Sequence, residues 1–225
     1  LKLTDIGLLY DKKVTCPICT IKFITKKVRS SKLKLIKRDE DFLSHYEGEN
    51  PLKYSIFVCP NCGYAAPENR FDKVGKREKE IVYKEITSKW NKRDYGGVRT
   101  IDEAIESYKL AIYIGQLLGY KKIELGSLCL NLAWLYRIKG NGDEELRFLK
   151  ITKDLYEAGY YNESLMDTNM DELRLGYLIG EISRRIGERE ESLKWFNSVL
   201  SNPGINSNPM LENMAREQWR TAREG

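Results

Sequence analysis

Two C-x-x-C pairs, Cys16 with Cys19 and Cys59 with Cys62, constrain the fold of this chain more than any other feature of its sequence. Each tight C-x-x-C turn can direct two sulfurs at one point, and structural zinc takes four such ligands in a tetrahedron. The spacing therefore predicts that these four cysteines together bind one structural Zn²⁺ ion.

The residues around the two pairs favour a zinc ribbon, in which each pair lies at the turn of a β-hairpin. The β-like runs KFITKKV and KYSIFV lie beside the cysteines, and Gly63 follows Cys62 directly, where it relieves backbone strain. A redox pair and two disulfides are the alternative interpretations. A thioredoxin-like C-x-x-C should open a helix within a βαβ pattern, and that pattern is absent from this sequence.

From Lys76 onward the apolar residues recur at helical spacing. Thr100 and Glu103 form a capping-box signature, and Gly119 is expected to end the helix that they begin. Turn and cap residues divide the rest into further helices. Helices are expected over residues 76–91, 101–118, 125–139, 143–156, 171–186, 190–200 and from 209 onward. Aromatic residues at helical spacing in this half are expected mostly to be core: Trp134, Tyr136, Tyr177, Trp195, Phe196 and Trp219.

The helical half resembles tetratricopeptide repeats, in which small residues let paired helices approach each other. Leu132, Ala133, Tyr136 and Gly140 fit one first helix and its turn. Another unit is matched by Gly180, Gly187, Ser192, Phe196 and Pro203. The predicted fold is α+β and mainly α, with a zinc-ribbon domain at residues 1–75 and a tetratricopeptide-like array of α-hairpins at residues 76–225. In such arrays the concave face holds a peptide or another protein, which is the partner expected here.

The paired cysteine motifs, the GYAA sequence after the second pair and the helical C-terminal region together resemble a bacterial family, domain of unknown function 2225. The resemblance covers nearly the whole chain. It implies the ribbon, the zinc site and the helices, and it brings no established activity.

Charge is unevenly distributed along the chain. The first 100 residues hold 22 Lys and Arg against 13 Asp and Glu, and the stretch from Lys12 to Arg38 holds ten basic residues and no acidic one. Phosphates attract such clusters, so nucleic-acid binding through Lys12 to Arg38 is one hypothesis. The other is that the lysines offset the negative charge of a four-thiolate zinc centre and protect strand edges from association.

No catalytic constellation is visible in the sequence, so no catalytic residue is assigned and a non-enzymatic adaptor is the expected function. The one histidine, His45, is expected to be exposed and not a metal ligand, and Cys129 is expected to be a small buried hydrophobe. The sequence contains no P-loop or dinucleotide-binding glycine pattern. With no apolar stretch of membrane-spanning length, a cytoplasmic location is expected.

Overall fold

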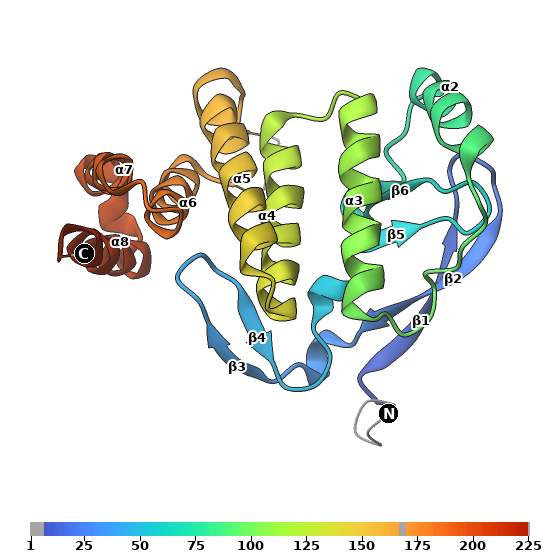
Figure 1. Ribbon diagram of the computed structural model, residues 1–225, viewed down its shortest axis with the longest axis horizontal. Coiled ribbons are helices and arrows are strands. Elements are labelled where there is room, and N and C mark those ends of the chain that lie inside the picture. Colours follow the sequence, from blue (N-terminus) through green and yellow to red (C-terminus); the bar gives the residue numbers. More distant parts are fainter. Residues whose placement is uncertain (1–6, 167–169, 225) are drawn as a thin grey trace. The chain divides into compact units, whose positions relative to one another are not determined.

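The computed structural model describes residues 7–166 and 170–224 (Figure 1). Its described strands form three antiparallel pairs. These are β1 (Leu9–Thr15) with β2 (Lys22–Val28), β3 (Leu35–Arg38) with β4 (Ser44–Tyr46), and β5 (Ile56–Val58) with β6 (Ala65–Pro67). Its α-helices are α1 (Glu68–Phe71), α2 (Lys76–Glu85), α3 (Ile101–Leu117), α4 (Lys122–Lys139), α5 (Gly142–Asn162), α6 (Glu172–Arg185), α7 (Arg189–Ser201) and α8 (Pro209–Glu224). The fold is thus mainly helical, with small antiparallel strand pairs near the N-terminus, as predicted.

The described chain forms two compact units. Unit 1 contains residues 7–38, 44–120 and 134–140, and unit 2 contains residues 39–43, 121–133, 141–166 and 170–224. The division into a zinc-ribbon domain at residues 1–75 and a helical domain at residues 76–225 stays a prediction.

Unit 1 contains a cluster of aromatic rings around Phe71. Phe71, at the end of α1, has its ring centroid 5.0 Å from Tyr64, 5.6 Å from Phe57 and 6.1 Å from Phe23. Three chain segments therefore meet on one side chain, which fixes β2, β5 and the turn before β6 against α1. Helix α3 packs against β5 and β6 (Figure 1).

The start and end of α3 confirm the expected caps. The Thr100 hydroxyl accepts a hydrogen bond from the Glu103 backbone N–H at 3.2 Å, and the Glu103 carboxylate accepts one from the Thr100 N–H at 2.7 Å. Gly119 follows the helix with a φ of +69°, a left-handed conformation that favours glycine.

Two predicted helix ends are wrong. Helix α2 stops at Glu85, and a 3₁₀ turn, η3 (Thr87–Lys89), replaces the expected continuation to residue 91. The β-branched residues Ile86 and Thr87 lie at this break, where tertiary hydrogen bonds described below outweigh helix propensity. Helix α5 continues to Asn162 rather than ending near Tyr156.

Unit 2 has an apolar core between α6, α7 and α8. Its buried members are Tyr177, Phe196, Val199, Ile205, Leu211 and Ala215. Phe42, from the 39–43 segment of the same unit, packs against Tyr177 with ring centroids 5.4 Å apart, and the Tyr177 hydroxyl donates to the Glu40 carbonyl at 2.9 Å. Most of the predicted core aromatics are indeed buried, while Trp134 and Trp219 are only half-buried.

Within the described residues, no helix combines the length and the apolar character that crossing a membrane requires.

Candidate metal centre

The two cysteine pairs converge on one point in unit 1. Cys16 and Cys19 lie in the turn between β1 and β2, and Cys59 and Cys62 lie in the turn between β5 and β6. All four Sγ atoms lie within 4.8 Å of one another. Three of the four cysteines are fully buried and Cys19 is half-buried. The convergence predicted from the spacing is confirmed, and the cluster could hold a metal ion.

The two turns, called knuckle 1 (residues 16–21) and knuckle 2 (residues 59–64), repeat the same backbone hydrogen bonds. In knuckle 1 the Cys16 carbonyl accepts from the Thr20 N–H at 2.9 Å, and the Cys16 N–H donates to the Ile21 carbonyl at 2.9 Å. In knuckle 2 the Cys59 carbonyl accepts from the N–H of Gly63, and the Cys59 N–H donates to the carbonyl of Tyr64. The repeated geometry presents each pair of sulfurs in the same way.

Both knuckles require a left-handed residue directly after their second cysteine. Gly63 fills this position with a φ of +74°, whereas knuckle 1 places Thr20 there with a φ of +62°. A β-branched residue in this conformation is strained by about 1–2 kcal/mol. The role proposed for Gly63 from the sequence fits this geometry, and Thr20 is the less favourable equivalent.

We expect Thr20→Gly to stabilise the protein by about 1 kcal/mol, because glycine relieves the strain at an exposed position. Urea unfolding followed by circular dichroism measures the change. Thr20→Val is the matched control, since it keeps a β-branched side chain in the strained conformation and replaces the hydroxyl by a methyl group, and it should give no gain. A lower stability for Thr20→Gly would refute this account of knuckle 1.

The sulfur–sulfur distances match a tetrahedral metal site. The Sγ atoms of Cys16 and Cys62 are 3.5 Å apart, and those of Cys19 and Cys59 are 3.6 Å apart. A tetrahedron with metal–sulfur bonds of about 2.3 Å has edges of about 3.8 Å. A disulfide requires about 2.05 Å, and all five cysteines of the chain are free.

The ionisation of the Cys16, Cys59 and Cys62 thiols is coupled through their mutual hydrogen bonds. Hydrogen bonds with Cys16 and Cys62 lower the pKa of the Cys59 thiol. The hydrogen bond with Cys59 raises the pKa of Cys16, and those with Cys16 and Cys59 raise the pKa of Cys62. One thiolate is thus stabilised at the expense of its neighbours, as expected for coupled groups. A divalent cation at the centre would favour the thiolate form of every sulfur.

A second layer of side chains holds both knuckles from the α2–η3 segment. The Tyr83 hydroxyl donates to the Ile18 carbonyl at 2.9 Å, the Thr87 hydroxyl to the Cys62 carbonyl at 3.1 Å, and the Trp90 indole N–H to the Pro60 carbonyl at 3.0 Å. Such partners fix the ligand-bearing turns in place. Sequence reasoning missed these three residues, because helical periodicity carries no signal for hydrogen bonds to a distant turn.

The fit between knuckle 2 and Trp90 is close. A Cβ at position 63 would lie 2.4 Å from Cδ2 of the Trp90 ring, so only glycine leaves room for the indole. Gly63 therefore serves both the left-handed turn and the contact with Trp90.

The remaining candidate ligands lie elsewhere. The four-cysteine cluster contains no histidine among the described residues; His45 lies on β4 and is half-buried rather than exposed. Cys129 lies on α4, where it is 2% exposed, and burial raises its pKa to about 12. This confirms Cys129 as a buried apolar residue.

Part of the basic stretch is neutralised within unit 1. Lys12 and Lys27 both form ion pairs with Glu68, and Lys26 pairs with Asp11 at 2.6 Å. Other basic residues of the stretch are exposed, including Lys13, Lys22, Arg29, Lys32 and Lys37.

Comparison with known proteins identifies relatives without an assigned activity. A protein-family model described as "Uncharacterized protein conserved in bacteria (DUF2225)" matches residues 9–222. An "Uncharacterized protein" of Borreliella burgdorferi is 30% identical over 128 residues, a match that covers 50% of this chain. The match spans 44% of the length of that relative. No solved structure matches the chain.

Proposed function

Because this chain belongs to the bacterial DUF2225 family, for which its relatives supply no activity, we propose a function from the site itself: a zinc-stabilised, non-enzymatic adaptor for other proteins. The metal centre organises unit 1, and the helical surface binds the partner.

Zinc is proposed as the metal because all four candidate ligands are sulfurs with nearly tetrahedral spacing. Zn²⁺ favours thiolates and four-coordinate geometry. A four-sulfur shell leaves no coordination position for water or substrate, so a single ion here would be structural. The hydrogen bonds to the carbonyls of Ile18, Pro60 and Cys62 support a rigid site of this kind.

A tetratricopeptide-like character is proposed for the α6–α7 hairpin. A Cβ at Gly180 would lie 2.9 Å from the Phe196 ring, so the small residue lets the two helices approach. Gly187 adopts a φ of +83° at the turn between them, and Ser192 is fully buried. These close approaches of small residues support the proposal of a repeat-like hairpin.

The observation that carries the adaptor proposal is an aromatic cluster at the surface of unit 2. Tyr160 on α5 lies edge-on to Trp195 on α7, with centroids 4.9 Å apart, and also packs against Tyr161 at 5.3 Å. Tyr161 is 72% exposed although its neighbours hold it in place. An exposed tyrosine that packs against a half-buried tyrosine and a buried tryptophan offers a large amphipathic contact surface, of the kind found at protein-binding sites.

Chemical crosslinking in the native host, followed by purification of the full chain and mass spectrometry, tests the adaptor proposal. We expect one protein to be crosslinked reproducibly to unit 2, and Tyr161→Ala to reduce its recovery about tenfold, as loss of a central aromatic anchor does. Met210→Ala, at another exposed apolar residue, is the control and should retain the partner. Equal recovery with both variants would rule out this surface.

Nucleic-acid binding is the second candidate, and the exposed cations of the β1–β2 hairpin and the segment after it favour it. Oligonucleotide binding that weakens steeply with salt would support it. The pairing of Lys12 and Lys27 with Glu68 reduces the positive charge that this surface offers, which makes it the weaker proposal.

A further inference from the structure

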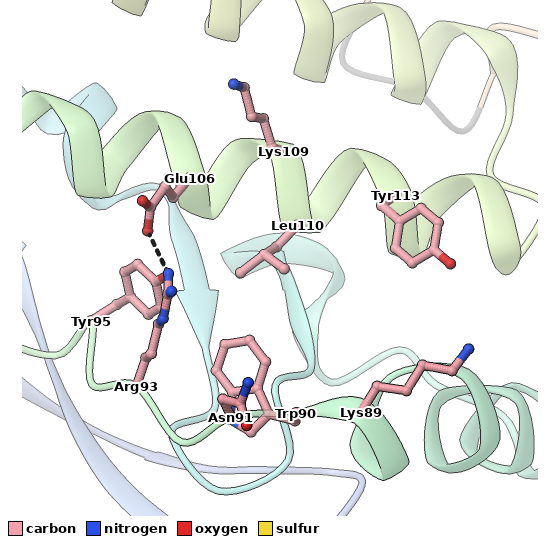
Figure 2. Close-up of a pocket in the computed structure, with 9 residues that line it drawn as sticks. All are labelled: Lys89, Trp90, Asn91, Arg93, Tyr95, Glu106, Lys109, Leu110 and Tyr113. Atoms are coloured by element: carbon pink, nitrogen blue, oxygen red, sulfur yellow. Dashed lines mark hydrogen bonds and ion pairs between the residues drawn. The ribbon is translucent and has the colours of Figure 1, made fainter.

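Unit 1 contains a pocket of about 500 Å³ between α3 and the segment around Trp90 (Figure 2). Its two flanking cations already have acidic partners: Arg93 lies 3.3 Å from Glu106, and Lys89 lies 3.3 Å from Glu85. The lining therefore selects no ligand by charge. In unit 2, in contrast, one face of α6 holds a segment of the chain itself in the way that a protein holds a peptide.

The held segment is the turn between β3 and β4, residues 39–43, called the acidic tip, whose sequence is Asp-Glu-Asp-Phe-Leu. Both the acidic tip and α6 belong to unit 2. The helix residues that contact the tip are Arg174, Tyr177 and Arg185. They share one face of α6, because residues three and eleven positions apart lie on the same side of a helix.

The acidic tip is held by contacts of the kind that recognise a peptide. The Phe42 ring packs against Tyr177, and the Arg174 guanidinium lies 5.3 Å from the centre of the Phe42 ring. The Glu40 carbonyl accepts a hydrogen bond from the Tyr177 hydroxyl, and the Glu40 carboxylate accepts one from Arg185 at 2.9 Å. An aromatic anchor, a main-chain hydrogen bond and a carboxylate–arginine pair together read a short segment by its chemistry.

A buried carboxylate preorganises the arginines of this face. Glu181 is fully buried and accepts hydrogen bonds from both Arg184, at 2.8 Å, and Arg185, at 2.7 Å. One carboxylate between two guanidinium groups leaves a net positive charge. Glu40 and the fully buried Asp41, whose carboxylate lies 3.8 Å from Arg185, meet that charge. The face therefore favours an acidic segment, and an acidic segment is what it holds.

The identity of residue 42 is explained by the contact with α6 and not by the turn. Phe42 has a φ of +72°, a left-handed conformation that glycine adopts freely and an aromatic residue adopts only with strain. Its N–H closes the turn on the Asp39 carbonyl at 2.9 Å, which the N–H of a glycine would do equally well. The strain is thus offset by what the ring contacts on α6.

The strands that carry the acidic tip leave it able to move away from α6. β3 is exposed along its whole length, and among the described strands β3 and β4 pair only with each other. A two-stranded pair is marginally stable by itself. Displacement of the tip therefore does not require the pairing of β1 with β2 or of β5 with β6 to break.

We propose that the α6 face formed by Arg174, Tyr177 and Arg185 binds an acidic segment with an aromatic anchor in a partner protein, and that the acidic tip occupies this site as an internal ligand. The proposal rests on the adaptor function, for which it names a second contact surface and the chemistry of the bound segment. A partner has to compete with a tethered ligand whose effective concentration is on the order of millimolar, so only a well-matched segment displaces it.

Fluorescence anisotropy with the full-length protein tests the proposal, using a labelled Asp-Glu-Asp-Phe-Leu peptide that is closed into a ring to keep its ends together. A tip variant combines Glu40→Ala, Asp41→Ala and Phe42→Gly, which frees the face and places a residue suited to the turn at position 42. We expect the tip variant to bind the peptide at least about tenfold more tightly than the unmodified protein, because the internal competitor is gone.

Two substitutions added to the tip variant locate the bound peptide. Tyr177→Phe keeps the ring in the core and removes the hydroxyl that donates to the main chain of the segment, so it should weaken binding about fivefold. Arg185→Ala removes the partner of the acidic side chain and should weaken binding at least about tenfold. Arg93→Ala, an exposed arginine of unit 1 shown in Figure 2, is the control and should leave the affinity unchanged.

Three results would overturn the proposal. One is no saturable binding by the tip variant up to on the order of 1 mM peptide. Another is equal binding of a peptide whose phenylalanine is replaced by alanine or whose acidic residues are replaced by lysines. The third is a dimer of the unmodified protein, detected by light scattering, that the peptide dissociates, which would assign the face to the tip of a second copy. The crosslinking experiment with Tyr161→Ala does not involve α6, so it tests the adaptor function separately.

Discussion

Chelation of the metal is expected to lower the melting temperature by about 10–20 °C and to expose the amides of β1, β2, β5 and β6 to exchange. The reason is that each of these elements is part of a two-stranded pair, and an isolated hairpin is marginally stable in water. Structural zinc supplies on the order of 10 kcal/mol of folding energy in small sites. Scanning calorimetry and amide hydrogen exchange, with and without a strong chelator, measure the effect.

Substitution of single cysteines separates loss of the metal from other effects of the chelator. Cys59→Ala should reproduce the chelated state, because it removes one of four ligands. Cys129→Ala is the control, since this buried cysteine lies outside the cluster, and it should keep the metal and the protection of the knuckles. If chelated and untreated protein melted at the same temperature, the metal would have no structural role.

Arg99→Ala is expected to destabilise unit 1 by about 3–5 kcal/mol, since each buried carbonyl that is left without a donor costs about 1–3 kcal/mol. Arg99 is 2% exposed, and its guanidinium donates to the backbone carbonyls of Tyr95 at 2.8 Å, Lys53 at 3.1 Å and Ile56 at 2.7 Å. Truncation would leave three buried carbonyls without their donor. Urea unfolding of the metal-loaded protein gives the free energy.

A neighbouring arginine provides the comparison. Arg93→Ala removes a side chain that is 63% exposed, and surface ion pairs contribute little, so its cost should stay below about 1 kcal/mol. Arg99→Lys should recover only part of the loss, because an ammonium group lacks the fork that reaches three carbonyls at once. Equal stability of Arg93→Ala and Arg99→Ala would show that the buried hydrogen bonds do not anchor the unit.

The sequence predicts the features of this fold that arise from local spacing. The two C-x-x-C pairs indicate the convergence of Cys16, Cys19, Cys59 and Cys62, since no other arrangement of two such turns satisfies one metal. The KFITKKV run corresponds to β2 without error. The cap formed by Thr100 and Glu103 likewise depends on residues three apart, and it is present.

What the sequence does not reveal depends on contacts between distant residues. In the sequence Arg99 is one more charged residue in a basic region, yet two of the three carbonyls that it binds lie more than forty positions away, in β5 and η2 (Pro51–Tyr54). The stretch around Trp90 has helical periodicity, but its hydrogen bonds to knuckle 2 end α2 early. Propensity is a weak guide wherever tertiary hydrogen bonds of this kind compete with it.

Zinc K-edge X-ray absorption of the purified full-length protein, combined with its native mass, tests the central claim most directly. The account predicts one zinc ion per chain, with four sulfur neighbours at about 2.3 Å. It would be contradicted by a native mass without metal in protein whose cysteines are reduced, or by a first shell containing nitrogen or oxygen in place of sulfur.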